Sequence, residues 1–60
     1  MNVEIINKYS KFSTSYYEVE EVVEDSYDHF HLKFLNGMNS QFYNKHIYKW
    51  RKLDDKPVHN

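Results

Sequence analysis

The dipeptide Asn36-Gly37 is the feature that most constrains the fold, because it marks a tight turn between two stretches of alternating side chains. A type I′ hairpin turn needs positive φ at both central positions, and Asn-Gly tolerates this geometry. Before the turn, residues 29–34 alternate polar and apolar side chains with the period of a half-buried strand. We therefore predict a β-hairpin from about Tyr27 to Tyr43, with a less regular second strand.

Further short strands are predicted on the N-terminal side of this hairpin. Residues 2–6 alternate in the same way and predict a first strand, followed by a polar loop over residues 10–15. Residues 16–24 predict a bent strand, in which Val22 and Val23 interrupt the alternation as a β-bulge would. The glutamates of this segment would also suit a helix, but its β-branched and aromatic residues favour the strand.

The C-terminal part predicts three short segments. Residues 44–47 fit a single helical turn with Asn44 as its cap. Residues 48–53 alternate again and predict a closing strand, and residues 54–60 read as a flexible tail. The fold class predicted for residues 1–53 is therefore all-β: one small antiparallel meander or partly open barrel of about four or five strands with one short helical turn.

The order of features over residues 17–53 resembles the later part of small SH3-like barrels of bacteria and phages. The resemblance rests on a bent meander with an Asn-Gly turn at Asn36, one helical turn ending at Ile47, and a final strand that carries Trp50. It implies a partly open SH3-like barrel. It implies no particular activity, since a fold of this kind hosts unrelated functions.

Small size makes the source of stability a central question. A chain of 60 residues buries only about 60% of the surface that it exposes when unfolded. The chain has no cysteine, so neither disulfides nor thiolate zinc sites can stabilise it. We expect a few of its 11 aromatic residues to supply the core. Tyr9, Tyr16 and Tyr17, together with Phe12, exceed what such a core can hold, so we expect exposed tyrosines at an interface, first of all that of a homodimer.

Composition also bears on the setting of the protein. No segment approaches the about 20 apolar residues of a membrane span, and the N-terminus lacks the pattern of a secretory signal, so a cytoplasmic protein is expected. The abundance of asparagine, lysine and tyrosine is typical of an AT-rich coding sequence. It favours a low-GC bacterium or one of its phages or mobile elements, where a small accessory or inhibitor protein would be encoded.

Charge is distributed unevenly along the chain, although the formal net charge is only −1. Residues 18–28 contain six acids and no base, whereas residues 29–53 contain five bases and no acid. The acidic segment predicts a surface for a protein partner, made by Glu18, Glu20, Glu21, Glu24, Asp25 and the neighbouring Tyr16. The other interpretation of these acids is that they keep an edge strand from pairing with other chains.

The basic segment predicts an alternative function, the binding of nucleic acid. It combines cations with an aromatic ring, as single-stranded nucleic-acid sites do; the residues concerned are Lys45, Lys49, Arg51, Lys52 and Trp50. If the aromatic rings of the closing strand belong to the core, however, these cations have no stacking partner. The near-neutral net charge also disfavours a general nucleic-acid binder.

Residues that could support metal or catalytic chemistry are few. His29 and His31 share one face of their strand, the spacing that could offer two imidazoles to one metal ion. The sequence shows no third ligand, so we predict neither a metal nor a cofactor. Glu24, Asp25 and Asp28 could pair as an acid and a base, yet a small domain with one glycine, without a phosphate loop or nucleophile elbow, is predicted to have no enzymatic activity.

Overall fold

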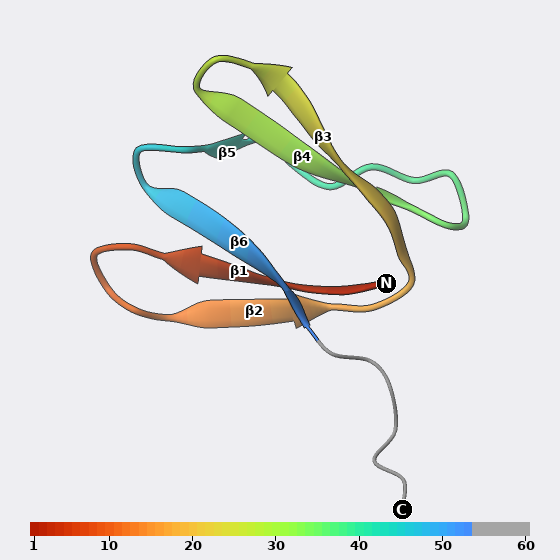
Figure 1. Cartoon of the computed structure of the whole chain (residues 1–60), viewed down its shortest axis with the longest axis horizontal. Coiled ribbons are helices and arrows are strands. Elements are labelled where there is room, and N and C mark those ends of the chain that lie inside the picture. Colours follow the sequence, from red (N-terminus) through yellow and green to blue (C-terminus); the bar gives the residue numbers. More distant parts are fainter. Residues whose placement is uncertain (54–60) are drawn as a thin grey trace, which may run out of the picture.

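The computed structural model describes residues 1–53, which form β-strands and no helix (Figure 1). The strands are β1 (Asn2–Asn7), β2 (Ser13–Tyr16), β3 (Val19–Ser26), β4 (His29–Phe34), β5 (Tyr43–Asn44) and β6 (Tyr48–Leu53). Every strand pairing is antiparallel. The prediction of an all-β, antiparallel fold is confirmed, while the predicted tail over residues 54–60 lies outside the described residues.

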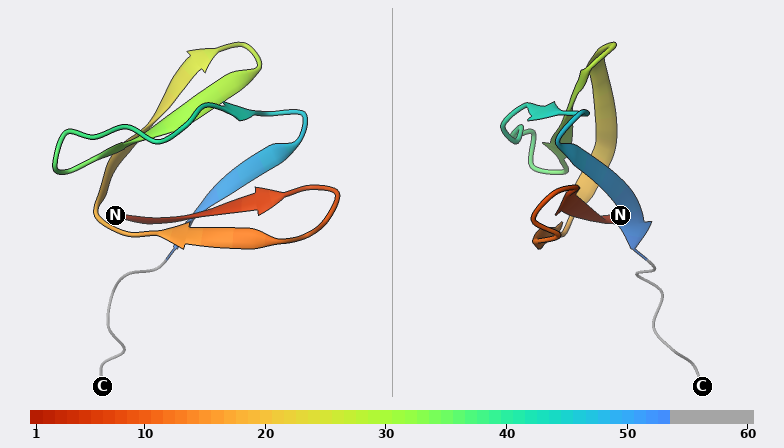
Figure 2. Two further views of the ribbon diagram at one scale, coloured as in Figure 1. Left: turned by 180° about the vertical axis from the view of Figure 1, so that it is seen from behind. Right: turned by 90° about the vertical axis from the view of Figure 1, so that its left-hand side faces the viewer.

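The strands form two sheets of three strands each. The first sheet has the order β2-β1-β6 and the second sheet has the order β3-β4-β5. The chain passes from the first sheet to the second between β2 and β3, and it returns between β5 and β6 (Figures 1 and 2). Within residues 1–53 no strand of one sheet pairs with a strand of the other, so the structure is not a closed barrel.

β1 is the central strand of the first sheet. Val3 and Ile5 are buried, as the alternation of residues 2–6 predicts. β2 pairs with β1 along its whole length, so the loop predicted over residues 10–15 is wrong in its second half. Serine has little intrinsic preference for a strand, and the pairing with β1 is what satisfies the backbone groups of Ser13–Tyr16.

The bent strand predicted over residues 16–24 is divided by a corner at Tyr17 and Glu18. Glu18 has φ of 58°, in the left-handed region that residues other than glycine rarely adopt. Its carbonyl oxygen accepts a hydrogen bond of 2.9 Å from the backbone N–H of Leu35. The corner sends the chain into the second sheet, and this division is one reason why the structure has more strands than predicted.

β3 is an edge strand with two irregularities. The register against β4 shifts between Val19 and Glu21, so Glu20 is the extra residue of a bulge. A second shift lies at Asp25. The predicted bulge is therefore present, but it lies before Val22 rather than at it. Bulges and exposed acids on an edge strand are the features that hinder its pairing with other chains.

The hairpin turn lies where it was predicted but has a different geometry. Gly37 has φ of 91°, whereas Asn36 is not among the residues with positive φ, so the turn is not type I′. The N–H of Gly37 donates to the carbonyl of Phe34 (2.9 Å), and the N–H of Phe34 donates to the carbonyl of Met38 (2.8 Å). This is the pattern of a three-residue loop that ends in a left-handed glycine.

The second arm of the hairpin is mostly irregular. After the turn, β4 pairs only through a single bridge between Lys33 and Asn39 and then through β5. The hydroxyl of Ser40 replaces a backbone carbonyl of the missing strand pairing, because it accepts the N–H of Leu32 at 2.8 Å. This irregularity agrees with the weak alternation of residues 38–43.

The helical turn predicted at residues 44–47 is not present; a hydrogen-bonded turn occupies its place. The side-chain oxygen of Asn44 accepts the N–H of His46 (2.7 Å), and its backbone carbonyl accepts the N–H of Ile47 (3.0 Å). The side chain of Asn44 thus satisfies the backbone, as the sequence suggests, but β6 begins at Tyr48 before a helix can propagate. Because the described residues contain no helix, they contain no helical membrane-span candidate.

The core lies between the two sheets and is small. Its buried residues are Val3, Ile5, Val19, Phe30, Leu32 and Tyr43. Phe30 and Tyr43 stack with ring centroids 5.4 Å apart, and they are the only aromatic residues among those buried in residues 1–53. Tyr9, Phe12 and Tyr17 are 77%, 79% and 63% exposed, in agreement with the expectation that these aromatic residues exceed what the core can hold.

Candidate functional site

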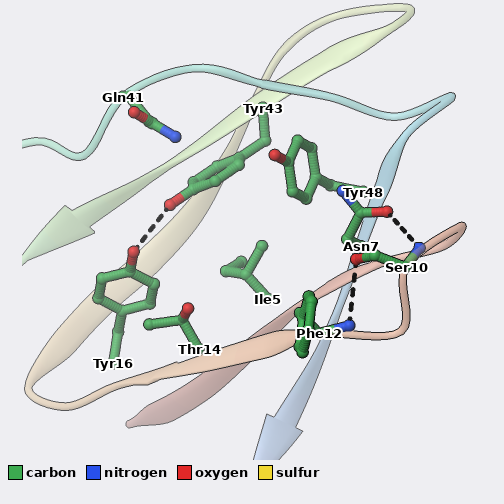
Figure 3. Close-up of a pocket in the computed structure, with 9 residues that line it drawn as sticks. All are labelled: Ile5, Asn7, Ser10, Phe12, Thr14, Tyr16, Gln41, Tyr43 and Tyr48. Atoms are coloured by element: carbon green, nitrogen blue, oxygen red, sulfur yellow. Dashed lines mark hydrogen bonds between the residues drawn. The ribbon is translucent and has the colours of Figure 1, made fainter.

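A pocket walled by aromatic rings opens between the β1–β2 hairpin and the segment that leads into β5 (Figure 3). We call it the tyrosine pocket. It has a volume of about 260 Å³ and is lined by Ile5, Asn7, Ser10, Phe12, Thr14, Tyr16, Gln41, Tyr43 and Tyr48. None of these lining residues carries a charge, so the pocket presents rings, hydroxyls and amides only.

Three tyrosines from different strands meet in this pocket. The hydroxyls of Tyr16 and Tyr43 are 3.0 Å apart and share a hydrogen bond, although the residues are 27 positions apart in the chain. The ring of Tyr48 meets that of Tyr43 edge-on, with centroids 5.2 Å apart. Burial, and then the hydrogen bond with Tyr16, raise the pKa of Tyr43 above its ordinary value, so its hydroxyl stays protonated at alkaline pH at which an ordinary tyrosine ionises.

The loop between β1 and β2 holds Phe12 at the rim of the pocket. The side-chain oxygen of Asn7 accepts the backbone N–H groups of Tyr9 (2.9 Å) and Ser10 (3.0 Å). Lys11 adopts φ of 71°, and the hydroxyl of Ser10 accepts the N–H of Phe12 at 3.2 Å. This bonding orders the loop around an exposed phenylalanine, so the ring is held beside the pocket.

A second hollow lies on the other side of Tyr48, which lines both. We call it the basic cleft. It has a volume of about 320 Å³ and is lined by Lys8, Glu24, Phe30, Lys45, Tyr48, Lys49 and Trp50. The cleft brings together three of the residues predicted for nucleic-acid binding, Lys45, Lys49 and Trp50. It adds Lys8, which could not be predicted from the sequence because only the pairing of β1 with β6 places the end of β1 beside Tyr48.

The other two predicted nucleic-acid residues lie outside this cleft. Arg51 lies on the face of β6 opposite to that of Trp50, and its Nε donates to a carboxylate oxygen of Glu4 at 2.6 Å. Lys52 is exposed and lies two residues beyond Trp50, on the strand face that also carries Trp50. Lys49 shares the strand face of Arg51 but lines the cleft together with Trp50, so what distinguishes Arg51 from Lys49 is its contact with Glu4.

The predicted acidic site is not gathered into one place either. Glu24 pairs with Lys45 at the basic cleft, and Asp25 lies 2.6 Å from His31. Tyr16 belongs to the tyrosine pocket. The remaining members, Glu18, Glu20 and Glu21, are exposed along the corner and the bulge of β3.

The two histidines of β4 are engaged by side chains rather than directed at a common point. The Nδ1 atom of His29 lies 3.0 Å from a carboxylate oxygen of Asp28. His31 contacts Asp25 through Nδ1 and Asn39 through Nε2, at 2.6 Å and 3.0 Å. Within residues 1–53 no three potential ligands cluster as a metal site would require.

Glu4 gives the fold an expected sensitivity to acid. Hydrogen bonds from the Ser13 hydroxyl and from Arg51 hold the pKa of Glu4 below its ordinary value of 4.5. The pKa of Glu4 is lower in the folded state than in the unfolded state. Its ionised carboxylate therefore stabilises the fold fully above the unfolded-state pKa, and this contribution is lost as the pH falls through the folded-state pKa. We expect the Tm to decrease between about pH 5 and pH 3, and Glu4→Gln to flatten that decrease.

Thermal melts followed by circular dichroism across this pH range would test the expectation. The pKa of Asp28 is also lowered, by His29 and Ser26, so the Tm of the Glu4→Gln variant should still decrease to some extent with falling pH. Glu20→Gln, which removes an exposed carboxylate of the bulge, serves as the control and should keep the wild-type slope. A Glu4→Gln variant with the same slope as the wild type would contradict this role of Glu4.

Comparison with known proteins adds no evidence about the site. Neither the protein-family models, nor the curated proteins, nor the solved structures contain a match to this chain.

Proposed function

We propose that this protein is a non-catalytic protein-binding module that takes one uncharged, apolar side chain of a partner protein into the tyrosine pocket. The observation that carries the proposal is the pocket itself, walled by Phe12, Tyr16, Tyr43 and Tyr48 with no charged residue in its lining. Aromatic walls offer large apolar area, and the hydroxyl and amide groups at the rim can bond to a partner backbone.

The size of the pocket favours a single side chain. Its volume of about 260 Å³ lies below the roughly 300–1,000 Å³ that is usual for small-molecule sites. Exposed aromatic residues continue on both sides of it along the chain, with Tyr9 at 77% and Tyr17 at 63% exposure. A small ligand would leave these rings in water, whereas a protein surface can cover them together with the pocket.

The acidic segment has a supporting role in this proposal. Of its predicted members, Glu18, Glu20 and Glu21 are exposed and make no ion pair with any of the residues 1–53. Charges at the rim of an interface accelerate association and select the partner more than they increase affinity. We therefore assign partner selection to these acids, and affinity to the tyrosine pocket.

The proposal extends to the fold and to the origin of the protein. We propose a partly open SH3-like barrel, supported by the bent meander, the turn at residues 44–47 and the closing strand that pairs back onto β1. Composition supports an accessory or inhibitor protein of a phage or other mobile element. The cytoplasmic location and the homodimer remain predictions of the sequence.

Substitution of Phe12 provides the test. Phe12→Ala removes one wall of the pocket at a residue that is 79% exposed, so the fold should tolerate it. Immobilised wild-type and variant proteins would capture partners from cells, and the affinity of the captured partner would then be measured with purified components. Since truncation of a central interface aromatic costs about 2 kcal/mol or more, we expect binding to weaken at least about 30-fold.

The matched control is Tyr27→Ala. Tyr27 is 95% exposed in the β3–β4 turn and does not line the tyrosine pocket, so this variant should bind like the wild type. Thr14→Arg is a second variant that places a long charged side chain at the pocket while leaving all its rings in place. A partner that binds Phe12→Ala and Thr14→Arg as tightly as the wild type would overturn the proposal.

A further inference from the structure

The basic cleft combines a stacking surface with an excess of positive charge. Three lysines and one glutamate line it, so the charged side chains leave a net positive charge beside Trp50. We propose that this cleft binds one nucleotide unit of a single-stranded nucleic acid, with the base against Trp50 and the phosphates against the lysines. The site is separate from the proposed protein-binding pocket and does not depend on it.

Trp50 is suited to act as the stacking surface. Its pairing opposite the buried Ile5 anchors it at the edge of the core, while 37% of the residue stays exposed. Phe30 and Tyr48 complete the apolar part of the cleft. A ring that is already held by its neighbours loses little freedom when a base stacks on it, and such stacking contributes about 1–3 kcal/mol per base.

The lysines of the cleft can bind phosphate because their present contacts leave N–H donors available. The ammonium group of Lys45 pairs with Glu24, and that of Lys8 donates to the carbonyl of Lys45 at 2.6 Å. Each ammonium group has three N–H donors, so both retain donors for a ligand. Lys49 makes no ion pair with any of the residues 1–53. The contacts therefore orient two cations and leave a third unpaired in this part of the chain.

A polymer fits these features better than a free nucleotide. The volume of about 320 Å³ suits one nucleotide unit, and Lys52, two residues beyond Trp50 on the same strand face, extends the positive charge past the cleft. The only glycine of the chain lies in the hairpin turn, so no glycine-rich loop cradles the phosphates of an isolated nucleotide. A duplex keeps its bases stacked inside, where Trp50 cannot reach them.

The chain contains one tryptophan, so its intrinsic fluorescence reports on the cleft directly. The probe is a labelled oligothymidylate of roughly ten nucleotides, followed by quenching of Trp50 and by anisotropy. We expect quenching, and weak binding that falls steeply between about 50 and 200 mM salt. Trp50→Phe should retain binding, whereas Trp50→Leu should weaken it about tenfold.

Lysine variants test the site even if Trp50→Leu fails to fold. Lys49→Gln should weaken binding and reduce the salt slope by about 0.7, the value for one phosphate contact of a single strand. Lys33→Gln makes the same change of charge on β4, outside the cleft, and should leave binding unchanged. Phe12→Ala should also bind the oligonucleotide normally, so failure of this inference and failure of the proposed protein binding can be told apart.

Several results would overturn the inference. One is the absence of both quenching and anisotropy change at low salt, and another is an equal effect of Lys49→Gln and Lys33→Gln. Binding of thymidine monophosphate as tightly as the oligonucleotide would assign the cleft to a free nucleotide instead. Equal affinity for duplex and single strand would show that only the phosphate backbone is bound.

Discussion

Phe30→Ala is expected to remove most or all of the stability of the fold at 25 °C. Phe30 is 1% exposed, lies on the central strand of the second sheet, and stacks on Tyr43 with a centroid separation of 5.4 Å. Replacement of a buried phenylalanine by alanine costs about 3–5 kcal/mol. A core of this size supplies no more than about 3–5 kcal/mol of net stability, so the substitution removes most or all of it.

Circular dichroism and urea denaturation would measure this loss. Phe42→Ala removes the same side chain from a position that is 64% exposed, and this control should change the free energy of unfolding little. A Phe30→Ala protein that still melts cooperatively within a few degrees of the wild type would contradict the expectation. It would mean that the two sheets are held together by contacts other than this stack.

Tyr43→Ala is expected to be comparably damaging, because this residue serves the core and the tyrosine pocket at once. Its ring is buried between Phe30 and Tyr48, and its hydroxyl bonds to that of Tyr16 at 3.0 Å. Loss of the ring costs about 3–5 kcal/mol. Tyr43→Phe keeps the ring and removes only the hydroxyl, so we expect a loss of about 1 kcal/mol and a Tm lower by about 4–8 °C.

Comparison of the two variants separates the roles of Tyr43. Urea denaturation gives the free energy of unfolding of each, and a double-mutant cycle with Tyr16→Phe isolates the energy of the bond between the hydroxyls. If Tyr43→Phe is as unstable as Tyr43→Ala, then the hydroxyl pair rather than the ring holds the sheets together. If the cycle shows no coupling, the two hydroxyls contribute to the pocket but not to the fold.

The parts of the fold that could be predicted are those set by neighbouring residues. The alternation around Val3 and Ile5, and that of residues 29–34, led to strands whose apolar members are buried or half-buried. Gly37 marked the turn because only glycine adopts positive φ freely. Its turn type was not predictable, since Asn36-Gly37 suits several geometries and the twist of the surrounding strands selects one.

The candidate sites were predictable only in part. The sequence drew attention to Tyr16, Lys45, Lys49 and Trp50, but it assigned Tyr16 to the acidic surface rather than to a pocket with Tyr43. Arg51 and Lys49 look equivalent in the sequence, yet they differ because Glu4 engages Arg51 across the first sheet. No pattern within a few residues contains this information.

The sequence by itself determined the β-class of the fold, the position of the hairpin turn and the closing strand, because the period of two and the backbone preference of glycine act between adjacent residues. Only the tertiary structure decided that Ser13–Tyr16 forms a strand, that Glu18 makes a corner, and that Lys8 joins the basic cleft. Each of these depends on contacts with another segment of the chain: β1 for Ser13–Tyr16, Leu35 for Glu18, and Lys45 for Lys8. Such pairings are stable only once both sheets enclose a common core, which no local preference specifies.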